Sequence, residues 1–140
     1  MEGECRGKRL LQFSGLLLIV FGAFSVLVDL ISLAGFFFGV VKALQISYVL
    51  FWANFAVYGL MAVTFIIAGI RGIRFSGIRE KADACVRLGV FLLLITAGAQ
   101  VLNFVYGSNA GTGMLNELLS AACALVLPVL YIAGARQNQR

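Results

Sequence analysis

The stretch LLLIVF at residues 16–21, inside an apolar run from residue 10 to residue 33, decides the fold class of this chain. Only two structures cross a membrane, the α-helix and the closed β-barrel, and barrel strands alternate between apolar and polar positions. Residues 16–21 do not alternate. The run also exceeds the roughly 20 helical residues that cross the hydrocarbon core of a bilayer. The stretch therefore predicts a membrane-spanning α-helix.

The composition of the whole chain agrees with this interpretation. Of the 140 residues, 61% are hydrophobic and 12% are charged, and the mean hydropathy is +0.99. A soluble domain of this size has a large surface for its volume and needs more polar residues to cover it. The composition therefore excludes a soluble domain, a nucleic-acid-binding protein and a disordered chain.

Four apolar runs are candidate membrane spans. They cover residues 10–33, 47–70, 86–106 and 115–135. We therefore predict an all-α integral membrane protein in which residues 1–140 form a single domain, a bundle of four transmembrane helices.

The basic residues predict the orientation of this bundle. With four spans, both termini share one side of the membrane with the loop between the second and third spans. Ten of the 11 Lys and Arg residues fall on that side, and Lys42 alone falls on the other. Short loops rich in Lys and Arg stay in the cytoplasm. We expect a multi-pass protein of the cell membrane with cytoplasmic N- and C-termini.

The two halves of the chain resemble each other. Residues 16–19 (LLLI), followed by Gly-Ala at 22–23, recur 76 positions later at 92–95 and 98–99. Ile-Ala-Gly at 67–69 recurs at 132–134, an offset of 65. These matches indicate either a duplication of one two-helix hairpin in parallel orientation or a chance agreement between membrane helices.

Small residues at helical spacing predict where the helices touch. Membrane helices associate through close packing at small side chains and through hydrogen bonds between helices. Residues seven apart lie on one face of a helix. A second register of the repeat, at an offset of 74, aligns Gly15, Gly22 and Asp29 with Gly89, Thr96 and Asn103. The predicted packing residues are Gly15, Gly22, Ser25, Gly89 and Thr96.

Polar residues gather toward the outer end of the helices. Asp29 is the acidic residue inside the first span, and a carboxylate within a membrane is costly enough to suggest a function. Facing one another, these residues would line an outward-facing pathway for a substrate or ion: Asp29, Asn54, Tyr58, Gln100 and Asn103. Two alternatives stay open. Asp29 lies in water at the outer interface or pairs with Lys42, or each polar group bonds to a neighbour and no cavity exists.

The segment between the second and third spans is basic. We predict that it forms a turn or short helix that contacts lipid headgroups through Arg71, Arg74, Arg79 and Lys81. The alternative is a docking site for a soluble partner.

Catalytic and metal-binding residues are scarce. The chain has no histidine, and its three cysteines (Cys5, Cys85 and Cys123) form no closely spaced pair. We therefore predict no enzyme activity, no metal and no cofactor. The leading hypothesis is a small structural or accessory subunit that acts through helix–helix contacts with a second copy or another membrane protein. The alternative is a transporter or channel subunit for a small solute or ion, using the outer polar residues.

Overall fold

The computed structural model describes residues 7–43, 45, 47–110 and 114–139, and these form an almost entirely helical fold. Its long helices are α1 (Lys8–Phe37), α3 (Tyr48–Phe75), α4 (Ala82–Ala110) and α5 (Met114–Gln139). A short helix α2 (Val40–Ala43) lies between α1 and α3, and a 3-10 turn η1 (Arg79–Lys81) precedes α4. The described residues contain no β-strand, so the prediction of an all-α fold is confirmed.

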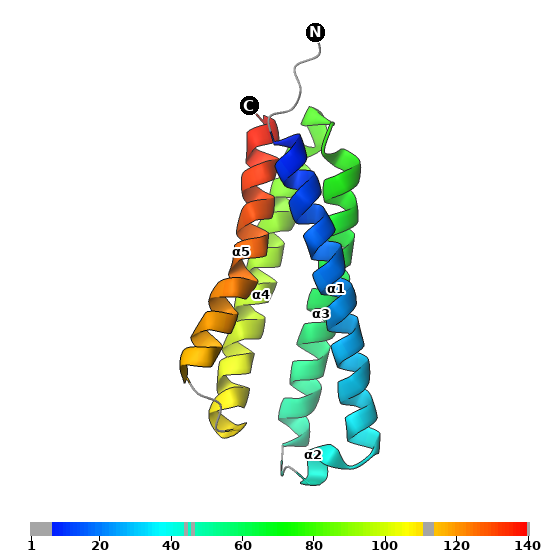
Figure 1. Cartoon of the computed structure of the whole chain (residues 1–140), viewed down its shortest axis with the longest axis vertical. Coiled ribbons are helices and arrows are strands. Elements are labelled where there is room, and N and C mark those ends of the chain that lie inside the picture. The colour runs from blue at the N-terminus through cyan, green and yellow to red at the C-terminus, as the bar shows by residue number, and fades with distance from the viewer. Residues whose placement is uncertain (1–6, 44, 46, 111–113, 140) are drawn as a thin grey trace.

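The four long helices run up and down in two hairpins (Figure 1). One hairpin is α1 with α3, and the other is α4 with α5; α1 also packs against α5, and α3 against α4. We call the end where α1 begins and α5 ends the terminal end of the bundle, and the opposite end the far end. Each long helix extends beyond the apolar run that predicts it.

Three helical segments are long and apolar enough to cross a membrane. They are Lys8–Phe37, Tyr48–Phe75 and Arg79–Val105. The segments qualify by their length and composition, and both properties follow from the apolar runs in the sequence.

The connection between α3 and α4 is shorter than the sequence predicts. The expected basic loop from Arg71 to Arg87 is mostly helical, because α3 continues to Phe75 and α4 begins at Ala82. Two turn residues, then Ile78, and the single turn of η1 join the two helices. Arg71 and Arg74 therefore lie on the last turns of α3, while Arg79 and Lys81 belong to η1.

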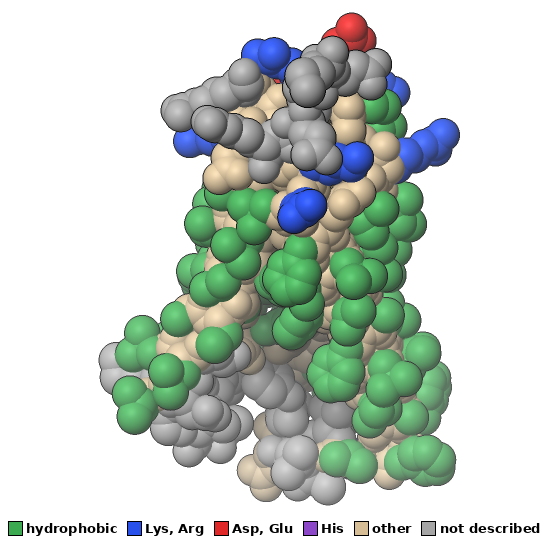
Figure 2. Space-filling view, turned by 45° about the horizontal axis from the view of Figure 1, so that its top comes forward, with side chains coloured by type: hydrophobic (Ala, Val, Ile, Leu, Met, Phe, Trp, Pro, Cys, Tyr) green, Lys and Arg blue, Asp and Glu red, His purple; other side chains and the backbone are tan. Residues whose placement is uncertain are grey.

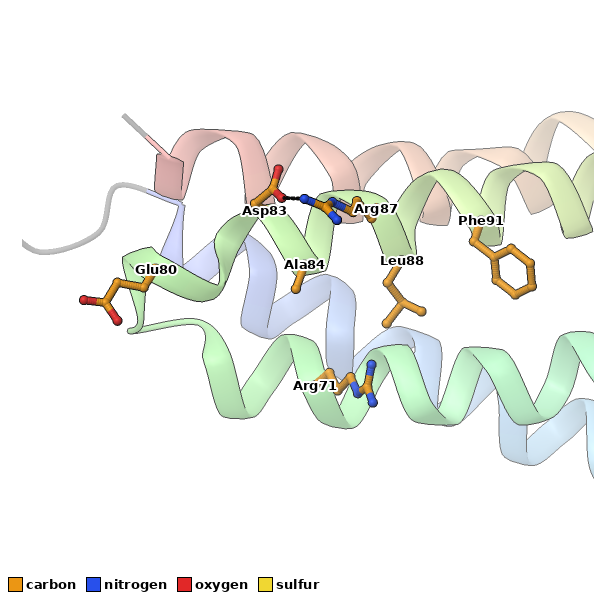
Figure 3. Close-up of a pocket in the computed structure, with 7 residues that line it drawn as sticks. All are labelled: Arg71, Glu80, Asp83, Ala84, Arg87, Leu88 and Phe91. Atoms are coloured by element: carbon orange, nitrogen blue, oxygen red, sulfur yellow. Dashed lines mark hydrogen bonds and ion pairs between the residues drawn. The ribbon is translucent and has the colours of Figure 1, made fainter.

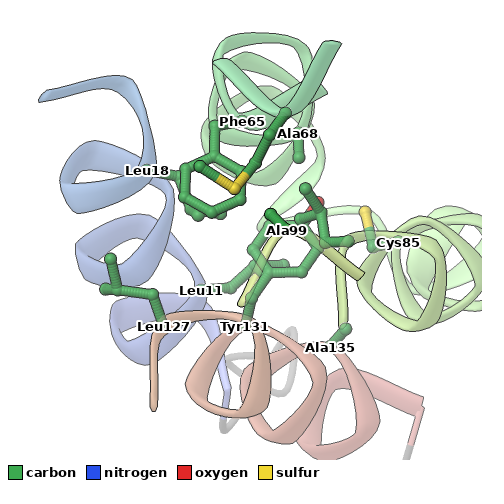
Figure 4. Close-up of a cluster of buried hydrophobic side chains, with 11 residues drawn as sticks. Leu11, Leu18, Phe65, Ala68, Cys85, Ala99, Leu127, Tyr131 and Ala135 are labelled. Carbon is green, nitrogen blue, oxygen red and sulfur yellow. The ribbon is translucent and has the colours of Figure 1, made fainter. Parts of the chain in front are cut away.

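The core shared by the four long helices occupies the half of the bundle next to the terminal end, and Phe51 of α3 is buried separately in the far half. No described residue of α4 beyond Ala99 is buried, and none of α5 before Leu127. The core is centred on Tyr131, which is fully buried where the four helices meet (Figure 4). In the far half the α1–α3 hairpin and the α4–α5 hairpin separate, and Figure 2 shows a notch between them.

Candidate functional site

Helices α1 and α3 approach each other closely at Gly15 and Gly69. A Cβ atom added to Gly69 would lie 2.5 Å from the Gly15 carbonyl oxygen, and one added to Gly15 would lie 2.9 Å from the Gly69 carbonyl oxygen. About two helical turns farther along α1, a Cβ atom added to Gly22 would lie 3.0 Å from the carbonyl oxygen of Ala62. The backbones therefore touch directly, as small residues allow in membrane helices.

The other predicted packing residues take different positions. Gly89 faces α5, where an added Cβ atom would lie 2.6 Å from the side chain of Ile132. Thr96 is fully buried, and its hydroxyl finds no hydrogen-bond partner among the described residues. Ser25 is half-buried on α1.

Two important contacts were not selected from the sequence. The ring of Tyr131 packs against Gly72 of α3, with Tyr131 Cε2 2.6 Å from the place of an added Cβ atom. Gly134 packs against the backbone of α1: a Cβ atom added to Gly134 would lie 2.9 Å from the Leu11 nitrogen. Gly134 ends the second copy of the Ile-Ala-Gly motif, and Gly69 ends the first. Both glycines contact α1, so the repeated motif was the signal that could have found them.

Polar bonds join the hairpins at the terminal end. The Asn138 side-chain amide donates to the Ser76 carbonyl oxygen at 2.9 Å. The Arg79 guanidinium donates to the Gln139 carbonyl oxygen at 3.3 and 3.2 Å. These bonds fix the end of α5 to the turn between α3 and α4.

Asp29 lies in a small pocket between α1 and α3 in the far half. The pocket has a volume of about 140 Å³ and is lined by Asp29, Ser32, Phe51, Asn54 and Phe55. The Asp29 carboxylate is turned toward α3, since a Cβ atom added to Gly59 would lie 3.7 Å from its Oδ2. That oxygen is buried and has no hydrogen-bond partner among the described residues. The pocket therefore presents an acidic oxygen that no described side chain neutralises.

Aromatic rings surround the far side of this pocket. Phe51 of α3 stacks on Phe36 of α1, with ring centroids 5.2 Å apart. Trp52 contacts the ring of Phe36 edge-on. Phe55 stacks on Phe51 and contacts Trp52 edge-on. These rings hold the far ends of α1 and α3 together, so the pocket belongs to one hairpin rather than to the whole bundle.

The structure brings only part of the predicted polar cluster together. Asp29 and Asn54 line one pocket, whereas Gln100 and Asn103 lie half-buried on α4 and are not among its lining residues. Tyr58 is half-buried, packs against the apolar core and lies close enough to Asp29 for the two side chains to interact electrostatically. Lys42 is exposed on α2 and forms no described ion pair with Asp29.

The predicted headgroup residues gather at the terminal end. Figure 2 shows Lys and Arg side chains at this end, above a surface that is mainly hydrophobic. Arg71, Arg74, Arg79 and Lys81 are all exposed there, and the Lys81 ammonium lies 4.4 Å from the centre of the Phe75 ring. A groove between α3 and α4 opens beside Arg71 (Figure 3).

Comparison with protein-family models, curated proteins and solved structures finds no match to this chain. Among the described residues, no group of three or more His, Cys, Asp and Glu side chains could hold a metal ion.

Proposed function

We propose that the chain is a four-span membrane protein with both termini in the cytoplasm. The three apolar segments support three of the spans, and α5, 26 residues long, packs beside α1 and α4 as the fourth. The basic residues at the terminal end support the orientation, because Lys and Arg favour the cytoplasmic side. The terminal end is then cytoplasmic and the far end is outside.

Within that membrane, we propose that the protein acts as a structural or accessory subunit through helix–helix contacts. One observation carries this proposal: the core that the four helices share stops about halfway along the bundle. In the far half, no described residue of α4 or α5 is buried, and the two hairpins carry exposed apolar residues such as Leu27 and Leu119. A helix from a second copy or from another membrane protein could sit between the far halves of the two hairpins and pack closely against them. Close packing of this kind joins helices in lipid.

Photo-crosslinking in intact membranes tests this proposal. A photoreactive side chain at Asn103, on the half-buried face of α4 in the far half, should form an adduct with a second polypeptide. The matched control is Val101, two residues away and 65% exposed on the same helix. Two differently tagged copies of the chain identify a self-adduct. Adducts at neither position, or equal adducts at both, would contradict a partner seated between the hairpins.

The Asp29 pocket favours a second candidate function, a pathway for a proton or a small cation. The supporting observation is the buried, unpartnered Oδ2 atom beside the amide of Asn54 and the hydroxyl of Ser32. Oxygen atoms of these types are suited to binding a hard cation. Intramembrane carboxylates also commonly mark proton and ion pathways.

Flux measurements in proteoliposomes test the second candidate. Potassium, sodium and proton flux would be followed for the wild type, for Asp29→Asn and for a control, Asn103→Ala, whose residue does not line the pocket. The pathway requires the carboxylate, so flux should be lost in Asp29→Asn and kept in the control. Absence of flux in the wild type, or equal flux in all three, would reject the pathway and leave the accessory role.

A further inference from the structure

A groove at the terminal end lies between α3 and α4 and opens toward the surroundings of the bundle. Its volume is about 480 Å³. Arg71 extends from α3 toward α4, and Leu88 extends from α4 toward α3 (Figure 3). Phe91, 49% exposed, continues the apolar lining along α4, about one turn farther from the terminal end. The groove is thus charged at its terminal end, where two arginines and the acids Glu80 and Asp83 line it, and apolar below.

The charges at the mouth of the groove are unequally paired. Arg87 forms an ion pair with Asp83 one turn away on α4, and both side chains are mostly exposed. Arg71 has no ion-pair partner among the described residues. Glu80 also lines the groove, and in Figure 3 its carboxylate is directed away from Arg71. A free guanidinium therefore faces the groove, and a second one stands at its rim with donors left for another acceptor.

The arrangement of charge and apolar surface matches one class of molecule. A phosphate group suits arginine, whose planar guanidinium binds it through paired hydrogen bonds. Leu88 and Phe91 offer no polar group, so they would suit a hydrocarbon chain that descends from the phosphate. A soluble phosphate compound has no use for that apolar lining, whereas a phospholipid has both parts in this order.

We propose that this groove binds one anionic phospholipid of the inner leaflet, with its phosphate between Arg71 and Arg87 and an acyl chain along Leu88 and Phe91. The proposal rests on the proposed orientation, which puts the groove at the cytoplasmic headgroup level. It differs from general attraction of a basic surface to a membrane, because two particular arginines and two particular apolar side chains form the site.

Native mass spectrometry of the full chain in detergent tests the site. The probes are phosphatidylglycerol, phosphatidylcholine and glycerol phosphate, the last representing a free phosphate compound. We expect one phosphatidylglycerol molecule to be retained in preference to phosphatidylcholine. Each of Arg71→Gln and Arg87→Gln should weaken its binding about fivefold, as expected for one surface cation. Asp83→Asn should strengthen the binding, because it releases Arg87 from its ion pair.

The controls are Arg74→Gln and Arg136→Gln, which remove exposed arginines at the same end that do not line the groove. Circular dichroism checks that each variant is folded. An equal loss of binding in the controls, no preference over phosphatidylcholine, or equally tight binding of glycerol phosphate would overturn the lipid site. Because the measurement is made in detergent, its failure is separable from an error in the orientation or in the accessory role.

Discussion

At the scale of single residues, the tight half of this bundle depends on the absence of side chains. Gly15 and Gly69 let two backbones touch, and Gly72 makes room for the Tyr131 ring. Other glycines have no such role: a Cβ atom on Gly98 would meet nothing within 4 Å. The chain thus offers both constrained and unconstrained helical glycines, which allows a matched comparison.

We predict that Gly69→Ala destabilises the protein by about 1–3 kcal/mol, the usual cost of overpacking a filled interior. The added methyl group would lie 2.5 Å from the Gly15 carbonyl oxygen and from Ile19 Cγ1, and the backbone oxygen cannot turn aside. Gly98→Ala should be neutral or stabilising by up to about 1 kcal/mol, since alanine favours the helix. Denaturant unfolding in detergent measures both. Equal effects of the two variants would contradict the close contact between α1 and α3.

At the scale of whole elements, the long helices bind their own polar side chains. The Ser14 hydroxyl donates to the Leu11 carbonyl oxygen at 3.2 Å, and the Thr64 hydroxyl donates to the Leu60 carbonyl oxygen at 2.7 Å. Such bonds within one helix satisfy a hydroxyl without a partner helix. Asp29 differs from them, because its Oδ2 atom has no such bond.

Helix α5 contains a proline at the level where it leaves the packed half. Pro128 is buried, whereas the described residues of α5 before Leu127 are not buried. A proline inside a helix removes one backbone hydrogen bond and bends the helix. We infer that Pro128 contributes to the separation of the far halves.

We predict that Pro128→Ala brings the far half of α5 closer to α1, because the restored backbone bond straightens the helix. Spin labels at Leu27 and Leu119, both exposed in the far half, report this distance by pulsed electron resonance. Labels at Arg9 and Arg136, near the terminal end, serve as the control pair and should not move. An unchanged distance between residues 27 and 119 would show that packing, rather than the proline, separates the hairpins.

At the scale of the whole molecule, the charge is distributed along the long axis. The described basic residues lie at the terminal end, except Lys42 on α2 at the far end. This asymmetry is the physical basis of the proposed orientation, since basic segments resist transfer across the membrane. In the proposed orientation, the proposed phospholipid groove and the Asp29 pocket lie toward opposite sides of the bilayer.

We predict that a membrane-impermeant maleimide labels Lys42→Cys in intact cells and labels Arg74→Cys only after the membrane is opened. Both positions are exposed, so the difference reports the side of the membrane and not burial. The native cysteines would first be replaced by serine. The opposite labelling pattern would reverse the orientation and place the Asp29 pocket in the cytoplasmic half.

Much of the fold follows from local sequence properties. Long apolar runs without alternation require helices in lipid, because each backbone group must bond within its own segment. The stripe that contains Gly15 and Gly22 correctly indicated the packed face of α1, because residues seven apart share a face. The sequence alone therefore determined the four helices, their approximate limits and the small residues at one interface.

Only the tertiary structure decided which polar residues meet. Asp29 and Asn54 share a pocket because α1 and α3 form one hairpin, joined by backbone contact at Gly15 and Gly69. Gln100 and Asn103 do not line that pocket, although the sequence places them, like Asp29 and Asn54, toward the outer ends of their predicted spans. Helix tilt and rotation depend on contacts between helices, such as the packing of Tyr131 on Gly72 at the terminal end. No pattern within one helix specifies such contacts, so the separation of the far halves could not be predicted from the sequence.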